Sequence, residues 1–316
     1  MESQDIYSKS IGKRIKLWMD ERFPLQNAPL FFIFYIISYS VAFYSIGEKP
    51  VLSWEILLGC LMSFSYFLLL RIFDEHKDYQ LDCEHHPQRI LQRGIITLKN
   101  LRLLGIGCIA LQLGGSVFLD QGIGSVTFAW LLVFIWTCLM GKEFFISEWL
   151  NQHLTWYAIS HMLVMPLIIW WLVNIASPNL TLTFPIWVLM GLCFFSGFSF
   201  EITRKCKGPD EERPEIPTYS SIFGRKGAVA IITALLTIML VLQIWLINIT
   251  TDDITSWAVI ILVVCYALCL WQLSKFLRHP TIQNRKRDEV VVGIFMVLGY
   301  SVCAASILIK LGLLKY

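Results

Sequence analysis

Long apolar runs alternate along the chain with short polar stretches. A helix needs about 20 apolar residues to cross a bilayer, and these runs lack the short alternating segments typical of barrel strands. The nine runs cover approximately residues 29–47, 51–70, 101–119, 124–141, 155–176, 184–200, 227–249, 254–277 and 290–311. The pattern predicts an all-α membrane protein with nine transmembrane helices in a bundle.

The composition supports a membrane protein, because 56% of the residues are hydrophobic and only 16% are charged. The positive charges lie almost entirely on one side of the predicted bundle. Only Lys49, Lys310 and Lys315 of the 26 lysines and arginines fall on the side opposite the N-terminus. Cytoplasmic segments carry an excess of positive charge. We therefore expect an integral, multi-pass protein of a bacterial inner membrane with its N-terminus in the cytoplasm. The net charge of +3 then reflects topology, and we expect membrane lipid but no nucleic acid as a partner.

The first 28 residues are polar and amphipathic, without the short apolar core and small-residue cleavage site of a signal peptide. In a helix, Ile11, Ile15, Trp18 and Met19 would share one face. This pattern predicts an interfacial helix on the cytoplasmic surface. The nine cysteines lie mostly inside the apolar runs, where we expect them to act as small hydrophobes.

The polar stretch after the second run carries three aspartates at a spacing of four. Asp74, Asp78 and Asp82 would stack on one face of a helix, where like charges repel. A bound hard cation would turn that repulsion into attraction, and Mg²⁺ is usually held by a few carboxylates together with substrate phosphates. Arg89 and Arg93 follow at the same spacing and could bind phosphate oxygens. The stretch therefore predicts a metal–diphosphate site; a solvated, self-neutralising loop is the alternative.

Residues 74–82, Asp-Glu-His-Lys-Asp-Tyr-Gln-Leu-Asp, resemble the NDxxDxxxD motif of the UbiA superfamily of intramembrane prenyltransferases. Asp74 stands where that family has Asn, and Glu75 where it has Asp. The following Pro87-Gln88-Arg89 and Arg93-Gly94 resemble the family's basic stretch. The resemblance implies a bundle of nine helices around a central cavity, Mg²⁺ as the cofactor and an isoprenyl diphosphate as the donor.

The polar stretch after the sixth run departs from the second motif of that family, DxxDxxxD. Glu201 matches the first Asp, but Arg204 and Gly208 stand where the other two would be. Asp210 and Glu211 are displaced candidates for the missing carboxylates. A charged loop without a metal role is the alternative here. Within the divergent motif, Arg204 and the adjacent Lys205 are candidate diphosphate ligands.

The two acidic stretches occupy corresponding places, since each follows the second run of a four-run set. This position predicts a single domain over residues 1–316, made of two pseudo-repeated four-helix halves and a ninth helix. In such an arrangement both acidic stretches face a shared cavity. Lys142, after the fourth run, resembles a diphosphate contact of the family, with a positive-inside anchor as the alternative. We expect His161, inside the fifth run, to hydrogen-bond a neighbouring helix, with a role in binding the acceptor as the alternative.

The sequence therefore predicts a Mg²⁺-dependent enzyme that moves a prenyl group from an isoprenyl diphosphate to an electron-rich, lipophilic acceptor within the membrane. The expected catalytic residues are Asp74, Asp78, Asp82 and Glu201, with Asp210 as a further metal ligand. A terpene cyclase of the same family would use the same donor and metal, and the divergent second motif keeps it open. A non-enzymatic transporter or carrier is the third possibility.

Overall fold

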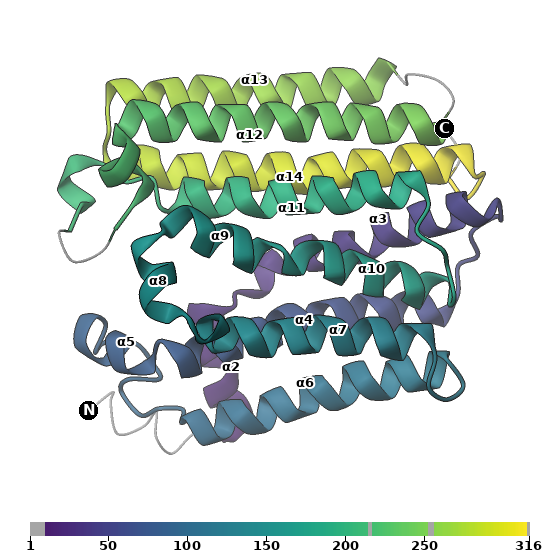
Figure 1. Cartoon of the computed structure of the whole chain (residues 1–316), viewed down its shortest axis with the longest axis horizontal. Helices are drawn as coiled ribbons and strands as arrows, with labels where there is room; N and C mark the ends of the chain where they lie inside the picture. The colour runs from purple at the N-terminus through teal and green to yellow at the C-terminus, as the bar shows by residue number, and fades with distance from the viewer. Residues whose placement is uncertain (1–9, 214–216, 252–255, 315–316) are drawn as a thin grey trace.

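The computed structural model describes residues 10–213, 217–251 and 256–314, and every regular element in this part of the chain is a helix. The long helices form a bundle with their axes roughly aligned, and the short helices gather at one end of it (Figure 1). The first half contains α2 (Ile11–Arg22), η1 (Leu25–Asn27), α3 (Ala28–Ile46), α4 (Trp54–Lys77), α5 (Tyr79–His85), α6 (Leu98–Leu119) and α7 (Ser125–Gly141). The second half contains η2 (Glu143–Phe145), α8 (Ser147–Gln152), α9 (Leu154–Met162), α10 (Val164–Ala176), α11 (Phe184–Arg204), η3 (Pro209–Glu211), α12 (Tyr219–Thr251), α13 (Ser256–Arg278) and α14 (Ile282–Lys310).

Eight helical segments of the described chain are long and apolar enough to cross a membrane. One of them, Leu154–Ala176, combines α9 and α10, which meet at Leu163. The remaining predicted run corresponds to α7, whose 17 residues lie at the lower limit of a membrane span. The protein is thus an all-α, integral, multi-pass membrane protein, as the apolar pattern predicts.

Two helices continue beyond the apolar runs that predict them. The second run ends near residue 70, but α4 continues to Lys77. The sixth ends near residue 200, but α11 continues to Arg204. Opposite charges three or four residues apart stabilise such polar turns, as the Arg71–Glu75 and Glu201–Lys205 pairs do here. Asp74 and Glu201 therefore lie on helices, beyond the ends of the apolar runs.

The core lies where helices from the first and second halves of the chain meet. α3 packs against α4, α10 and α14, and α14 also packs against α11, α12 and α13. Large aromatic side chains from both halves are buried there, including Tyr35, Tyr66, Trp171 and Tyr300. Because lipid is as apolar as these side chains, close packing and polar contacts hold such a bundle together. The hydrogen bond between the hydroxyls of Tyr66 and Thr137, 2.6 Å long, is one such contact between α4 and α7.

The N-terminal helix α2 docks on the protein. Trp18 is fully buried, although we expected its face to lie on the membrane surface. Arg22 donates from Nε to Glu75 Oε1 on α4 at 2.7 Å. Glu21 accepts the backbone N–H of Ile90 at 2.9 Å. These contacts fix α2 to the segment that carries the first acidic motif.

Candidate active site

A cavity of about 850 Å³ opens where the two polar segments meet. Asp78 and Asp82 line it from the first segment, and Lys205 and Pro217 line it from the second. Tyr157 of α9 lines the same cavity. The structure therefore brings the two segments to one hollow, which the corresponding positions of the two acidic stretches predict.

The first motif bends at its central aspartate. α4 ends at Lys77, α5 begins at Tyr79, and Asp78 lies at the junction. Backbone hydrogen bonds from Asp78 N to Asp74 O and from Asp82 N to Asp78 O, each 2.9 Å, keep a helical spacing across the junction. Our expectation of one continuous helix is wrong, because the helix is interrupted at Asp78. The side chains instead meet different partners.

Asp74 and Asp78 have only distant cationic partners. Asp74 Oδ2 lies 3.7 Å from Arg71 Nη1, and Asp78 Oδ1 lies 3.9 Å from Lys77 Nζ. About half of each aspartate side chain is exposed. Burial raises the pKa of Asp78 above its ordinary value, against the opposing effect of Lys77. A carboxylate that is costly to ionise and weakly paired is well suited to bind a cation.

Asp82 is paired with arginine side chains. Its Oδ2 accepts a hydrogen bond from Arg89 Nη1 at 2.6 Å and lies 3.6 Å from Arg22 Nη2. Arg89 therefore neutralises a motif carboxylate in this structure, while we expected it to contact diphosphate. Arg93 lies exposed in the following turn and is not among the residues that line the described cavities.

Glu75 is a buried part of the site that we did not include among the predicted ligands. Only 1% of its side chain is exposed, and it pairs with both Arg22 and Arg71. A buried charge needs such partners because desolvation penalises it strongly. Glu75 thus links α2 to α4 directly behind the exposed aspartates.

A cluster around Tyr157 completes the wall opposite the aspartates. Lys77 donates from Nζ to the Tyr157 hydroxyl at 2.6 Å and lies 3.3 Å from Glu143. Lys205 Nζ lies 5.1 Å from the centre of the Tyr157 ring, and the ring of His161 stacks on it at 4.1 Å. The expectation for His161 is wrong, because its Nδ1 donates to the Tyr157 carbonyl of its own helix at 2.8 Å and its buried Nε2 has no hydrogen-bond partner among the described residues.

Lys77 and Tyr157 are site residues that the sequence reasoning missed. Lys77 lies inside the motif, at a position that the family pattern leaves unspecified. Tyr157 is one of many aromatic residues in the apolar runs, so its type carries no signal. A search for basic and phenolic side chains within one turn of the motif would have found Lys77 together with Arg71 and Tyr79, but not Tyr157.

Of the described charged residues in the second polar segment, only Lys205 lines the cavity of about 850 Å³. Glu201 pairs with Arg204 at 3.0 Å and with Lys205 at 2.8 Å. Asp210 lies exposed on η3, apart from the described cavities. Glu211 pairs at 2.8 Å with Arg285 of α14. The structure therefore does not bring the displaced acids, Asp210 and Glu211, to the aspartates of the first motif.

The carboxylates of the site provide only a small number of metal ligands. Among the described residues, no group of three or more His, Cys, Asp or Glu side chains is close enough to hold a metal ion. Mg²⁺ commonly takes one or two carboxylates and fills its other positions with water and substrate phosphates. Asp74 and Asp78 provide that smaller set. Lys142 lines an adjoining hollow with Lys77 and Asp78.

A family model described as the UbiA prenyltransferase family matches residues 30–299. The chain belongs to this family. The match confirms the resemblance seen in the first acidic motif and covers both polar segments. Comparison with curated protein sequences finds no match.

Solved structures of UbiA homologues share the fold. A UbiA homologue from Aeropyrum pernix K1 aligns with a TM-score of 0.64 at 14% identity, over 86% of this chain and 97% of that one. A digeranylgeranylglyceryl phosphate synthase gives 0.62 at 16% identity, over 94% and 99%. A homologue from Archaeoglobus fulgidus, bound to DMAPP and Mg²⁺, gives 0.53 at 14% identity, over 88% and 98%. At these identities the likeness establishes the fold alone.

Proposed function

We propose that this UbiA-family protein is a Mg²⁺-dependent prenyltransferase that moves a prenyl group from an isoprenyl diphosphate to an electron-rich, lipophilic acceptor in the membrane. The observation that carries the proposal is the cavity in which Asp78 faces the basic side of the second segment, represented by Lys205. A diphosphate with a bound cation needs both kinds of partner. The Archaeoglobus fulgidus homologue, which binds DMAPP and Mg²⁺, supports this choice of donor and metal.

In the proposed site, Asp74 and Asp78 would hold Mg²⁺, which would offset the negative charge growing on the leaving diphosphate. Lys205 and Arg204 would bind diphosphate oxygens from the opposite wall. Lys77 would do so from α4, with its Nζ held in place by Tyr157. Cations fixed in position before the bond breaks stabilise the transition state more than mobile ones do.

The acceptor would attack the allylic carbon as the carbon–oxygen bond to the diphosphate breaks. Its electron pair forms the new bond, the diphosphate leaves with the old pair, and the acceptor then loses a proton. The apolar helices around the cavity would exclude water, which would otherwise capture the allylic cation. We also propose that the two four-helix halves and α14 form one functional domain, with the N-terminus in the cytoplasm of a bacterial cell.

Asp82 and Glu201 hold a different place in this proposal from Asp74 and Asp78. Each is engaged by basic side chains at 2.6–3.0 Å. They would reach a metal only by releasing those partners when the donor binds. The fixed charges of Arg204 and Lys205 would do part of the work that a second cation does where the family motif is complete.

The test is product analysis with purified protein, Mg²⁺ and a panel of C10 to C40 isoprenyl diphosphates. Incubation with candidate aromatic and lipid acceptors should give a prenylated acceptor and free diphosphate, and chelation of Mg²⁺ should stop both. A cyclised hydrocarbon or alcohol from donor alone would instead identify a terpene cyclase, which the divergent second motif leaves open. Failure to release diphosphate from any donor would refute both enzymatic proposals.

A further inference from the structure

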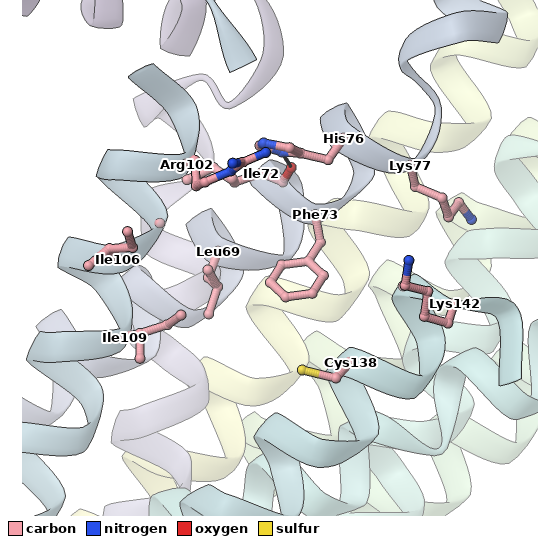
Figure 2. Close-up of a pocket in the computed structure, with 12 residues that line it drawn as sticks. Leu69, Ile72, Phe73, His76, Lys77, Arg102, Ile106, Ile109, Cys138 and Lys142 are labelled. Carbon is pink, nitrogen blue, oxygen red and sulfur yellow. Dashed lines mark hydrogen bonds between the residues drawn. The ribbon is translucent and has the colours of Figure 1, made fainter. Parts of the chain in front are cut away.

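A second hollow lies on the flank of the bundle between α4, α6 and α7. It measures about 470 Å³ (Figure 2). Its floor is apolar, with Leu69 and Phe73 from α4 and Ile109 from α6. Figure 2 shows the sulfur of Cys138, from α7, at the edge of this floor. We call this hollow the flank groove.

The rim of the flank groove is basic at the end nearest the polar segments. His76, Arg102 and Lys142 line it there, and none of the described residues that line the groove is acidic. His76 Nε2 is buried without a hydrogen-bond partner. Arg102 is exposed and forms no ion pair with the described residues. His76 Nδ1 donates to the Ile72 carbonyl at 2.8 Å, so Nε2 of the neutral ring is an acceptor. Arg102 and Lys142 therefore supply the donors that the rim presents to an anion.

The flank groove opens to the side of the bundle where lipid chains lie. α6 packs mainly against α4 and α7 in the described chain. Ile106, which lines the groove, is 55% exposed. Gly141 lets Phe73 approach α7 closely, since a Cβ at this glycine would lie 2.9 Å from Phe73 Cδ1. The floor is therefore continuous with the hydrocarbon layer.

We propose that the flank groove binds one anionic phospholipid, with an acyl chain on the apolar floor and the headgroup phosphate on Arg102 and Lys142. A free phosphate would leave the floor unused, and a neutral lipid would leave the rim unpaired. Anionic lipids gather at the membrane surface where basic residues lie. A groove of this volume is of the usual size for a ligand site.

The lipid would lie directly behind the proposed active site. Phe73 and Gly141 form part of the groove and also line a small inner cavity that contains Asp74 and His161. Lys77 lines both as well, but its Nζ is bound to Tyr157. The groove therefore shares Phe73 and Gly141 with this inner cavity, and among the described residues it shares only Lys77 with the reaction cavity.

Cys138 provides a local reporter for this proposal. Full-length protein is reconstituted in bilayers of phosphatidylcholine alone or with phosphatidylglycerol, and alkylation of Cys138 by N-ethylmaleimide is followed by peptide mass. Phosphatidylglycerol should slow alkylation in the unmodified protein. Arg102→Gln should weaken that protection about fivefold, since one basic residue contributes about this much to anionic-lipid binding. Arg287→Gln, an exposed charge on α14, should leave it unchanged.

Two further experiments distinguish lipid binding in the groove from other causes of Cys138 protection. Ile106→Trp fills the floor without changing charge, and it should remove the preference for phosphatidylglycerol while the protein remains folded. Geranyl diphosphate, in contrast, should not protect Cys138. Equal protection by both lipids, an Arg102→Gln variant that behaves like the unmodified protein, or protection by geranyl diphosphate alone would each overturn the proposal. None of these readouts requires the prenyltransferase reaction.

Discussion

The carboxylates around the cavity differ most in the cations that surround them. Glu75 and Asp82 are held by arginines at hydrogen-bond distance, and Glu201 is held by Arg204 and Lys205. Asp74 and Asp78 have no cation closer than 3.7 Å among the described residues. Residue type alone does not separate these two groups. Their partners do, and on this ground we propose Asp74 and Asp78 as the metal ligands.

We expect Asp78→Asn to abolish turnover without unfolding the protein. The substitution keeps the shape of the side chain and removes the charge proposed to bind Mg²⁺. Loss of one such electrostatic contact typically costs about 10²–10³ in rate. Diphosphate release measures the effect, and thermal unfolding in detergent checks the fold. Asp20→Asn, an exposed acid on α2, is the matched control. Full activity of Asp78→Asn would contradict the metal role of Asp78.

Lys205→Met should weaken donor binding. A hydrogen bond to a charged group contributes about 1.5–3 kcal/mol, which corresponds to roughly 10–100-fold in affinity. The change also leaves Glu201 with one basic partner fewer. Calorimetric titration with geranyl diphosphate and Mg²⁺ measures the affinity. Lys226→Met removes an exposed charge near the same end of the bundle and should not alter it. Unchanged affinity for Lys205→Met would remove Lys205 from the diphosphate site.

At the scale of elements, the site depends on the ion pairs that hold the end of α4 and the start of α5 in place. α2 contributes no residue that lines the cavity among those described, yet its Arg22 bridges Glu75 on α4 and Asp82 on α5. This contact spans the bend at Asp78. An amphipathic pattern predicts where such a helix lies relative to water and lipid, but not which acids its last turn will meet.

The Arg22–Glu75 contact should stabilise the docked position of α2. Arg22→Gln leaves a buried carboxylate with one partner fewer, and disruption of a buried ion pair costs about 3–5 kcal/mol. Arg22→Gln should therefore lower the melting temperature. Glu75→Gln in the same chain should recover part of the loss because no buried charge is then left underpaired. Lys13→Gln, an exposed change on α2, should have little effect. Strict additivity of the two single changes would show that the pair does not interact.

The turn between α6 and α7 provides a pH-dependent contribution to stability. Burial opposes ionisation of Asp120, but hydrogen bonds from the backbone of Thr127, Val126 and Gly124 and from the Thr127 hydroxyl outweigh it and lower the Asp120 pKa. Folding thus favours the ionised form. The contribution is present above the unfolded-state pKa of about 3.9 and is lost as the pH falls through the lower folded-state value.

Asp120→Ala should consequently destabilise the protein by about 1 kcal/mol at neutral pH, the usual cost of a lost helix cap. The difference from the unmodified protein should shrink as the pH falls below about 4. Thermal unfolding at several pH values measures both effects. A difference that stays constant down to acid pH would show that the charge of Asp120 is not involved.

For the whole molecule, the apolar pattern predicts the bundle well because crossing a membrane requires about 20 apolar residues per helix. It places the ends of helices poorly wherever ion pairs prolong them, as at Arg71 and Glu75 on α4. The first motif leads to Asp74 and Asp78, but no sequence pattern marks Tyr157. Its role arises from its contacts with Lys77, which precedes it by 80 residues, and with Lys205. Both lysines are adjacent to Tyr157 only in the folded chain.

The orientation of the bundle is the prediction with the widest consequence, since it determines which side supplies the donor. The basic end, with the cavity, should face the cytoplasm. Cys83 is exposed at this end, whereas the other described cysteines are buried or partly buried. A membrane-impermeant maleimide should therefore label Cys83 in inside-out vesicles and spare it in right-side-out ones. Glu48→Cys, at the opposite end, should show the reverse pattern. Labelling of Cys83 from the outside would invert the topology and place the diphosphate site outside the cell, away from the cytoplasmic supply of isoprenyl diphosphates that we expect.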